Sequence, residues 1–109
     1  MTQTLKVLGQ SAPAATTLTD FYTVPGATTT SVSTISVANT SSSADTFRVS
    51  VAIGGAANNV KQYLYYDITI PGNNTFMATV GLSLGTGDVL RCYSGSGNCS
   101  FQAFGAENS

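Results

Sequence analysis

The clearest pattern in the sequence is an alternation of apolar and polar residues with a period of two. Between Thr46 and Ile53 every second residue is apolar, and these residues are expected to face inward: Phe47, Val49, Val51 and Ile53. The segment Thr75–Leu84 repeats the alternation, and Gly81 within it indicates a bulge or a close backbone approach. A period of two is typical of strands that bury one face. Both segments are therefore predicted to be half-buried β-strands.

A third alternating segment, Gln62–Ile70, is predicted to pair with Thr75–Leu84. Its two faces are expected to hold different sets of residues: Leu64, Tyr66, Ile68 and Ile70 inward, and Tyr63, Tyr65, Asp67 and Thr69 outward. Residues 71–74 between the two segments read Pro-Gly-Asn-Asn, a composition typical of turns. We therefore expect the two strands to form a hairpin.

Five further strands are predicted from shorter apolar patterns next to turn residues: Thr4–Gly9, Leu18–Val24, Ser31–Asn39, Asp88–Tyr93 and Asn98–Phe104. In the third of these the phase slips between Val32 and Ile35, which a bulge would explain. Eight strands about ten residues apart are typical of an antiparallel sandwich or a small barrel. We therefore expect an all-β fold, an antiparallel β-sandwich of about eight strands, jelly-roll-like or Ig-like, forming a single domain over residues 1–109.

The composition is poor in charge and rich in hydroxyl groups. The 109 residues include 16 threonines and 13 serines but only 8% charged residues, against an average of about 25%. Four basic and five acidic residues give a formal net charge of -1, which provides no basic patch for phosphates. Nucleic-acid binding is therefore disfavoured. No apolar stretch has the length of a signal peptide or a membrane helix, so we expect synthesis in a cytoplasm and no membrane partner.

The sequence also argues against most catalytic chemistry. It contains no histidine, which removes the Ser-His-Asp and Cys-His catalytic sets, histidine-ligated zinc and the usual proton shuttle near neutral pH. The remaining carboxylates are scattered along the chain, at Asp20, Asp45, Asp67, Asp88 and Glu107. A carboxylate pair could act as a glycosidase only if two of them faced one cleft, which spacing does not reveal. We expect a protein that is not an enzyme and needs no metal or cofactor.

Two cysteines near the C-terminus are candidates for a disulfide. A hairpin turning at Ser94–Gly97 would set Cys92 directly opposite Cys99, within disulfide reach. The alternative is a pair of buried thiols that stay reduced, because the missing secretion signal favours synthesis in a reducing compartment. The residues leave both alternatives open.

The segment Tyr63–Asp67 is the candidate interaction site. It holds three of the five tyrosines, and if Leu64 and Tyr66 point inward, then Tyr63 and Tyr65 share the outer face with Asp67. Such a face could bind a protein partner, because tyrosine is enriched at interfaces. It could also stack on and hydrogen-bond a sugar, or form a solvated cross-strand aromatic pair.

Several blocks of the sequence resemble small structural proteins of tailed bacteriophages. The resemblance spans nearly the whole chain and is carried by strand and turn signatures: Leu8–Pro13, Thr17–Pro25, Phe47–Val51, Tyr63–Asp67, Asn74–Phe76, Leu90–Tyr93, Ser100–Phe101 and Phe104–Gly105. It supplies no catalytic residues.

The resemblance implies a protein of the virion. Virion proteins of this size are often β-sandwiches that decorate or cement the capsid, commonly as trimers at local symmetry axes, with the major capsid protein or other virion proteins as partners. The same resemblance permits a tail, baseplate or fibre component. A carbohydrate-binding module for host adsorption, with the tyrosines as its platform, is an alternative from a different class.

Overall fold

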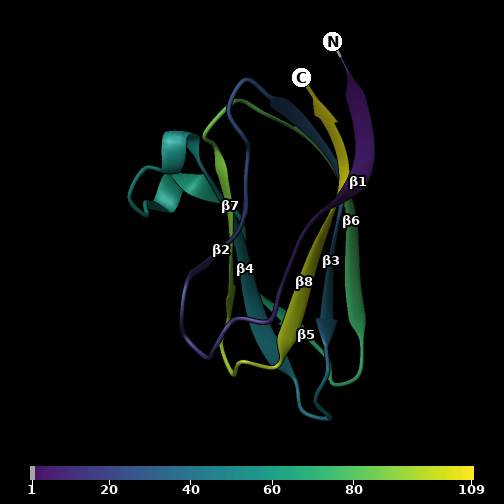
Figure 1. The fold of residues 1–109 in the computed structure, drawn as a ribbon. Coiled ribbons are helices and arrows are strands. Elements are labelled where there is room, and N and C mark those ends of the chain that lie inside the picture. Colours follow the sequence, from purple (N-terminus) through teal and green to yellow (C-terminus); the bar gives the residue numbers. More distant parts are fainter. Residues whose placement is uncertain (1) are drawn as a thin grey trace.

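The structure, a computed structural model, describes residues 2–109 and contains eight strands. The strands are β1 Gln3–Ser11, β2 Thr19–Thr23, β3 Thr29–Asn39, β4 Asp45–Ala52, β5 Tyr63–Ile70, β6 Thr75–Leu84, β7 Val89–Ser94 and β8 Cys99–Asn108. Two short 3-10 turns, η1 Ile53–Gly55 and η2 Val60–Gln62, lie between β4 and β5 and project beside the strands (Figure 1). Each of the eight predicted strands is confirmed, with ends that differ by a few residues.

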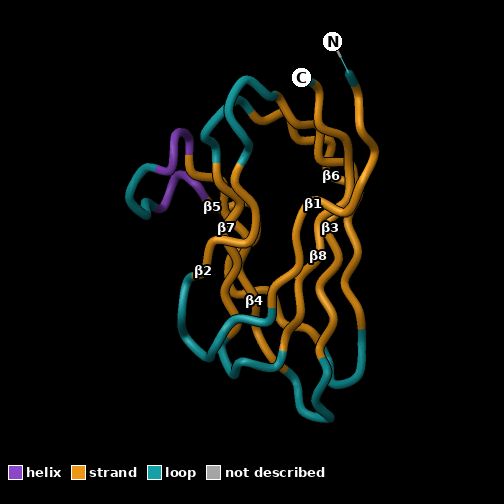
Figure 2. Tube along the Cα trace, in the orientation of Figure 1, coloured by secondary structure: helices purple, strands orange, loops and turns teal. Residues whose placement is uncertain are grey.

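The strands form two four-stranded antiparallel sheets that pack face to face (Figure 2). The strand orders are β1-β8-β3-β6 and β2-β7-β4-β5. Read from the middle of the chain outward, β4 pairs with β5, β3 with β6, β2 with β7 and β1 with β8. The chain is thus one long antiparallel ribbon, folded at its midpoint and rolled into two layers, which is the jelly-roll arrangement. The predicted all-β sandwich is confirmed, and the strand order favours the jelly roll over the Ig-like alternative.

The predicted hairpin between Gln62–Ile70 and Thr75–Leu84 is wrong. β5 pairs with β4 and β6 pairs with β3, so residues 71–74 carry the chain from one sheet to the other. Turn residues suit either kind of connection, and alternation identifies a buried face without identifying the neighbouring strand. The partners of β5 and β6 are set by the folding of the whole ribbon, in which β4 pairs with β5 and β3 pairs with β6.

The bulges predicted in the strands Ser31–Asn39 and Thr75–Leu84 are confirmed. The register of β3 shifts between Val32 and Thr34 against both of its neighbours, so Val32 and Ile35 are both fully buried although they are three residues apart. Gly81 lies in the same irregularity with a φ of 60°, a conformation that glycine adopts without strain. β1 bulges at the same level, between Val7 and Gly9. The irregularity therefore crosses the whole sheet.

The core lies between the two sheets and contains a group of packed aromatic rings. The Phe47 ring lies 5.1 Å from Phe76 and 6.3 Å from Phe101, measured between centroids, and Phe21 lies 6.2 Å from Phe101. Phe47 and Phe101 are fully buried. Ile53, predicted to face inward, is instead 79% exposed, because β4 ends at Ala52 and the chain turns into η1.

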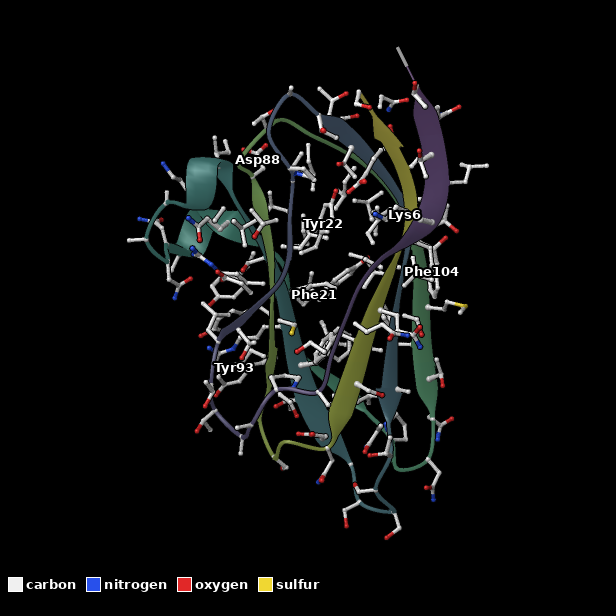
Figure 3. All side chains as sticks on the ribbon, in the orientation of Figure 1. Lys6, Phe21, Tyr22, Asp88, Tyr93 and Phe104 are labelled. Carbon is white, nitrogen blue, oxygen red and sulfur yellow. The ribbon has the colours of Figure 1, made fainter. Side chains whose placement is uncertain are left out.

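Two polar networks connect parts of the fold that are distant in sequence, the first partly buried and the second buried. Tyr22 on β2 donates a hydrogen bond to Glu107 of the opposite sheet at 2.6 Å and contacts the Thr30 hydroxyl at 2.7 Å, while Lys6 forms an ion pair with Glu107 at 3.1 Å. Figure 3 shows Tyr22 and Phe21 reaching into the space between the sheets. Burial and the bond to Glu107 raise the pKa of Tyr22 to about 12.

The second network is centred on Asp45 at the start of β4, which is 4% exposed. Its carboxylate accepts five hydrogen bonds, from Ser94 Oγ, Cys99 Sγ and the backbone N–H groups of Thr46, Ser96 and Asn98. Burial alone would raise its pKa, but the hydrogen bonds outweigh burial and lower the pKa of Asp45 to about 2. Asp45 therefore fixes the β7–β8 connection against β4 as a buried, ionised side chain.

Candidate functional site

The outer face of the β2-β7-β4-β5 sheet carries an arginine surrounded by tyrosines. The Arg48 guanidinium carbon lies 4.2 Å from the centroid of the Tyr66 ring and 4.1 Å from that of Tyr93, so the cation is placed between two aromatic rings. Arg48 also donates to both carboxylate oxygens of Asp67, at 2.6 and 3.2 Å. Tyr63 packs edge-on against Tyr66, with 4.9 Å between centroids. These five residues are called the Arg48 cluster below.

Local strand geometry brings the Arg48 cluster together. Arg48 lies between Phe47 and Val49, which are both fully buried, so its side chain leaves the sheet on the outer side, and its register partner on β7 is Tyr93. On β5 the register against β4 shifts on both sides of Val49. Within the first of these irregularities Asp67 has a φ of 52°, in the left-handed region. The irregularity places the Asp67 carboxylate against Arg48.

In the Arg48 cluster, Arg48 and Asp67 form a bidentate ion pair, and the Tyr66 ring beside it is exposed. The hydrogen bonds that Arg48 donates to Asp67 are the main cause that raises the pKa of Arg48 above its usual range, so the guanidinium stays charged. Its side chain is 21% exposed, whereas the Asp67 side chain is 44% exposed and Tyr66 is 54% exposed. Both oxygens of the Asp67 carboxylate accept hydrogen bonds from Arg48. The cluster offers a ring, a hydroxyl and the remaining carboxylate lone pairs to a partner.

The predicted outer face of Gln62–Ile70 is partly correct. Tyr63 and Asp67 both belong to the Arg48 cluster, but Tyr65 points the other way, with its ring 6.1 Å from Phe47 and 5.2 Å from Phe76. Conversely, Leu64 and Tyr66, predicted to face inward, are 40% and 54% exposed. The alternation misleads here because the irregular register of β5 reverses its phase.

The sequence interpretation missed Arg48, Tyr66 and Tyr93 as members of the site. Arg48 had one usable signal, since it is a lone cation at an outward position of a strongly alternating strand. No feature of the sequence pointed to Tyr93, because its position beside Arg48 depends on β7 lying next to β4.

The predicted hairpin that would set Cys92 opposite Cys99 is wrong. Cys92 lies on β7 and Cys99 on β8, which belong to different sheets. Both thiols are free and fully buried in the core, which corresponds to the reduced alternative. Burial raises the pKa of Cys92 to about 12 and that of Cys99 to about 11. Both residues are therefore protonated at neutral pH, in a form that is not nucleophilic.

A second candidate surface lies on the β1-β8-β3-β6 sheet, which is almost free of charge. Lys6 and Glu107 are the only charged residues on its four strands, and they neutralise each other in an ion pair. The other seven charged residues of the chain lie on the opposite sheet or in connections. Three exposed apolar residues lie on this sheet, namely Leu5, Val7 and Met77, which are 80%, 47% and 65% exposed. The surface they share is called the uncharged sheet face below.

The uncharged sheet face also includes an aromatic side chain. Phe104 is half-buried and is the register partner of Val7 on β1 and of Thr34 on β3. Figure 3 shows Phe104 on the side of the sheet away from the core. The face thus combines apolar side chains with the small hydroxyl groups of neighbouring strands, a mixture suited to contact with protein.

Fold and surfaces together define the class: a jelly-roll β-sandwich with an uncharged face on one sheet and a charged, aromatic face on the other. Within residues 2–109 no three His, Cys, Asp or Glu side chains are grouped so that they could hold a metal ion. The same residues include no helix long and apolar enough to cross a membrane. No known protein-family model and no curated protein matches the chain.

Proposed function

We propose that the chain is a non-enzymatic structural protein of a tailed-bacteriophage virion, a capsid decoration or cement protein that binds the major capsid protein. The observation that carries this proposal is the uncharged sheet face. The strands beneath it contain no unpaired charge, and Leu5, Val7 and Met77 remain exposed on it.

The cost of burying a surface depends on the charges that it carries. A charged side chain that enters an interface loses its hydration, which costs several kcal/mol unless a partner compensates. Hydroxyl groups and apolar side chains carry a much smaller cost, and charged residues are depleted at interface centres. The uncharged sheet face is thus suited to lie flat against a protein shell. By analogy at the level of fold alone, jelly rolls serve as viral capsid proteins and as lectins.

The location and copy number of the protein in purified particles test this proposal. A decoration protein should be found on the head in hundreds of copies, measured by quantitative mass spectrometry and by cryo-EM of the intact particle. Tens of copies or fewer, with density on the tail, would assign the chain to a tail, baseplate or fibre instead. Absence from the particle would refute the virion proposal altogether.

A matched pair of variants tests the surface itself. Val7→Glu places a charge on the uncharged sheet face, and Val60→Glu places the same charge on η2, where Val60 is 84% exposed. We expect Val7→Glu to weaken binding to particles that lack the protein by tenfold or more, while Val60→Glu binds like the parent. Equal binding by both variants would show that the shell is contacted elsewhere.

Carbohydrate binding during host adsorption is a second candidate function, favoured by the Arg48 cluster. There Tyr66 is the most exposed ring, and it lies beside a half-exposed carboxylate. If the cluster binds sugars, a glycan array should show binding by the parent protein that Tyr66→Ala abolishes. A parent protein that binds no glycan on the array would rule out this function.

A further inference from the structure

The two sheets end in four edge strands, and the first half of one of these edges lacks the usual protection. Exposed strand edges invite pairing with another chain, and proteins guard them with charged residues, proline, bulges or short strands. β1 carries Lys6, β2 is five residues long and carries Asp20, and β5 carries Asp67 in an irregular register. β6 is ten residues long, with the sequence TFMATVGLSL, and contains neither a charge nor a proline.

The first half of β6 is regular as well as uncharged. From Thr75 to Thr79 it pairs with β3 without a shift in register, and the irregularity at Gly81 begins only after this stretch. Because β6 is the last strand of its sheet, the other edge of these residues pairs with no strand in residues 2–109. Phe76 and Ala78 are only partly buried, and Met77 on the opposite side is 65% exposed. Both faces of the stretch thus keep accessible apolar surface.

We propose that the Thr75–Thr79 edge pairs in antiparallel fashion with the same edge of a second copy, about a two-fold axis at Met77. In this register Thr75 lies opposite Thr79, Phe76 opposite Ala78, and Met77 opposite its own counterpart. Inward-facing residues therefore meet inward-facing residues, and the two four-stranded sheets become one continuous sheet. The large Phe76 ring faces the small Ala78, so the strand is complementary to itself.

A second copy is the occupant that the edge fits best. The stretch carries no charge, so two copies meet without repulsion, and it offers no charge by which a different, charged strand would be selected. A two-fold contact uses the same patch on both partners, so the pair is closed and exposes no further β6 edge for growth into fibres. The inference does not depend on the virion proposal, because strand pairing uses the backbone edge of β6, although Met77 also lies on the uncharged sheet face.

Sedimentation equilibrium over a range of concentrations tests the pairing. The parent protein should show reversible association to twice the 11.2 kDa chain mass. Met77→Lys places two cations together on the axis and should abolish the dimer without changing the fold, because Met77 is an exposed side chain. Gln3→Lys, which adds the same charge to the exposed edge strand β1, should leave the dimer intact. A parent that stays monomeric or forms a trimer, or a dimer that survives Met77→Lys, would overturn the proposal.

Cross-linking tests the register independently of affinity. In the proposed pairing residue 77 meets itself across the axis, so Met77→Cys should give a disulfide-linked dimer under oxidising conditions. Ser83→Cys, on the same strand but beyond the Gly81 irregularity, should not. The native cysteines are buried and do not compete. Cross-linking of Ser83→Cys in place of Met77→Cys would contradict the two-fold axis at Met77.

Discussion

At the scale of single residues, Asp45 is a buried carboxylate that accepts five hydrogen bonds. Its ionised form is stabilised by five donors, so its pKa is about 2 in the folded protein and about 3.9 when the chain is unfolded. A lowered pKa stabilises the fold fully above the unfolded value, and this stabilisation is lost as the pH falls toward the folded value. We expect the parent protein to lose about 2 to 3 kcal/mol of unfolding free energy between about pH 4 and pH 2 from this group.

Replacing Asp45 with asparagine should remove both the stability and its pH dependence. An amide keeps one acceptor oxygen but turns a nitrogen toward donors that then lack a partner, so Asp45→Asn should cost about 2 to 4 kcal/mol at neutral pH. Urea unfolding at several pH values measures both effects, and the variant should show the flatter profile. Asp20→Asn is the control, because the Asp20 side chain is 61% exposed in its ion pair with Arg91 and should contribute less than about 1 kcal/mol. Equal losses in the two variants would contradict the role given to Asp45.

At the scale of elements, one side of the sandwich closes where β1 passes β2 at Gly9. A Cβ atom at Gly9 would meet the backbone carbonyl of Phe21, which cannot move aside as a flexible side chain does. We expect Gly9→Ala to lower the unfolding free energy by about 1 to 3 kcal/mol, because the two strands must separate. Gly26→Ala, at a turn where an added Cβ contacts nothing, should be close to neutral. Urea unfolding compares the two, and a neutral Gly9→Ala would show that the strands are loosely held.

The elements also show what the sequence could and could not predict. Alternation located all eight strands, because burying one face of a strand imposes a period of two over its own length. It could not identify partners, so the hairpins expected at residues 71–74 and at Ser94–Gly97 both prove to be passages between sheets. It also failed on β5, where the irregular register exchanges the faces of Tyr65 and Tyr66. The Arg48 cluster was therefore only half foreseen, since its other members depend on strand order and on that irregularity.

At the scale of the whole molecule, charge is distributed unequally between the two sheets. Five of the nine charged residues lie on the β2-β7-β4-β5 strands, whereas the opposite sheet holds one internally neutralised pair. If the uncharged sheet face is the one that contacts the shell, binding should not rely on attraction between charges, which salt screens. We therefore expect co-sedimentation of the protein with particles to be nearly the same at low and high NaCl. A steep loss of binding with salt would indicate that the charged sheet makes the contact.

The rolled ribbon determines which strands can pair while the chain is still being synthesised. Because Gln3 pairs with Asn108, the outermost rung of the ribbon joins segments from opposite ends of the chain. A ribosome releases β1 long before β8 exists, and only β4 and β5, at the fold of the ribbon, are made close together. Such distant pairings close slowly, because the entropy of a large loop is lost before any contact compensates it. β1 must therefore wait for β8, and the nascent chain carries an unpaired β1 until β8 has been synthesised.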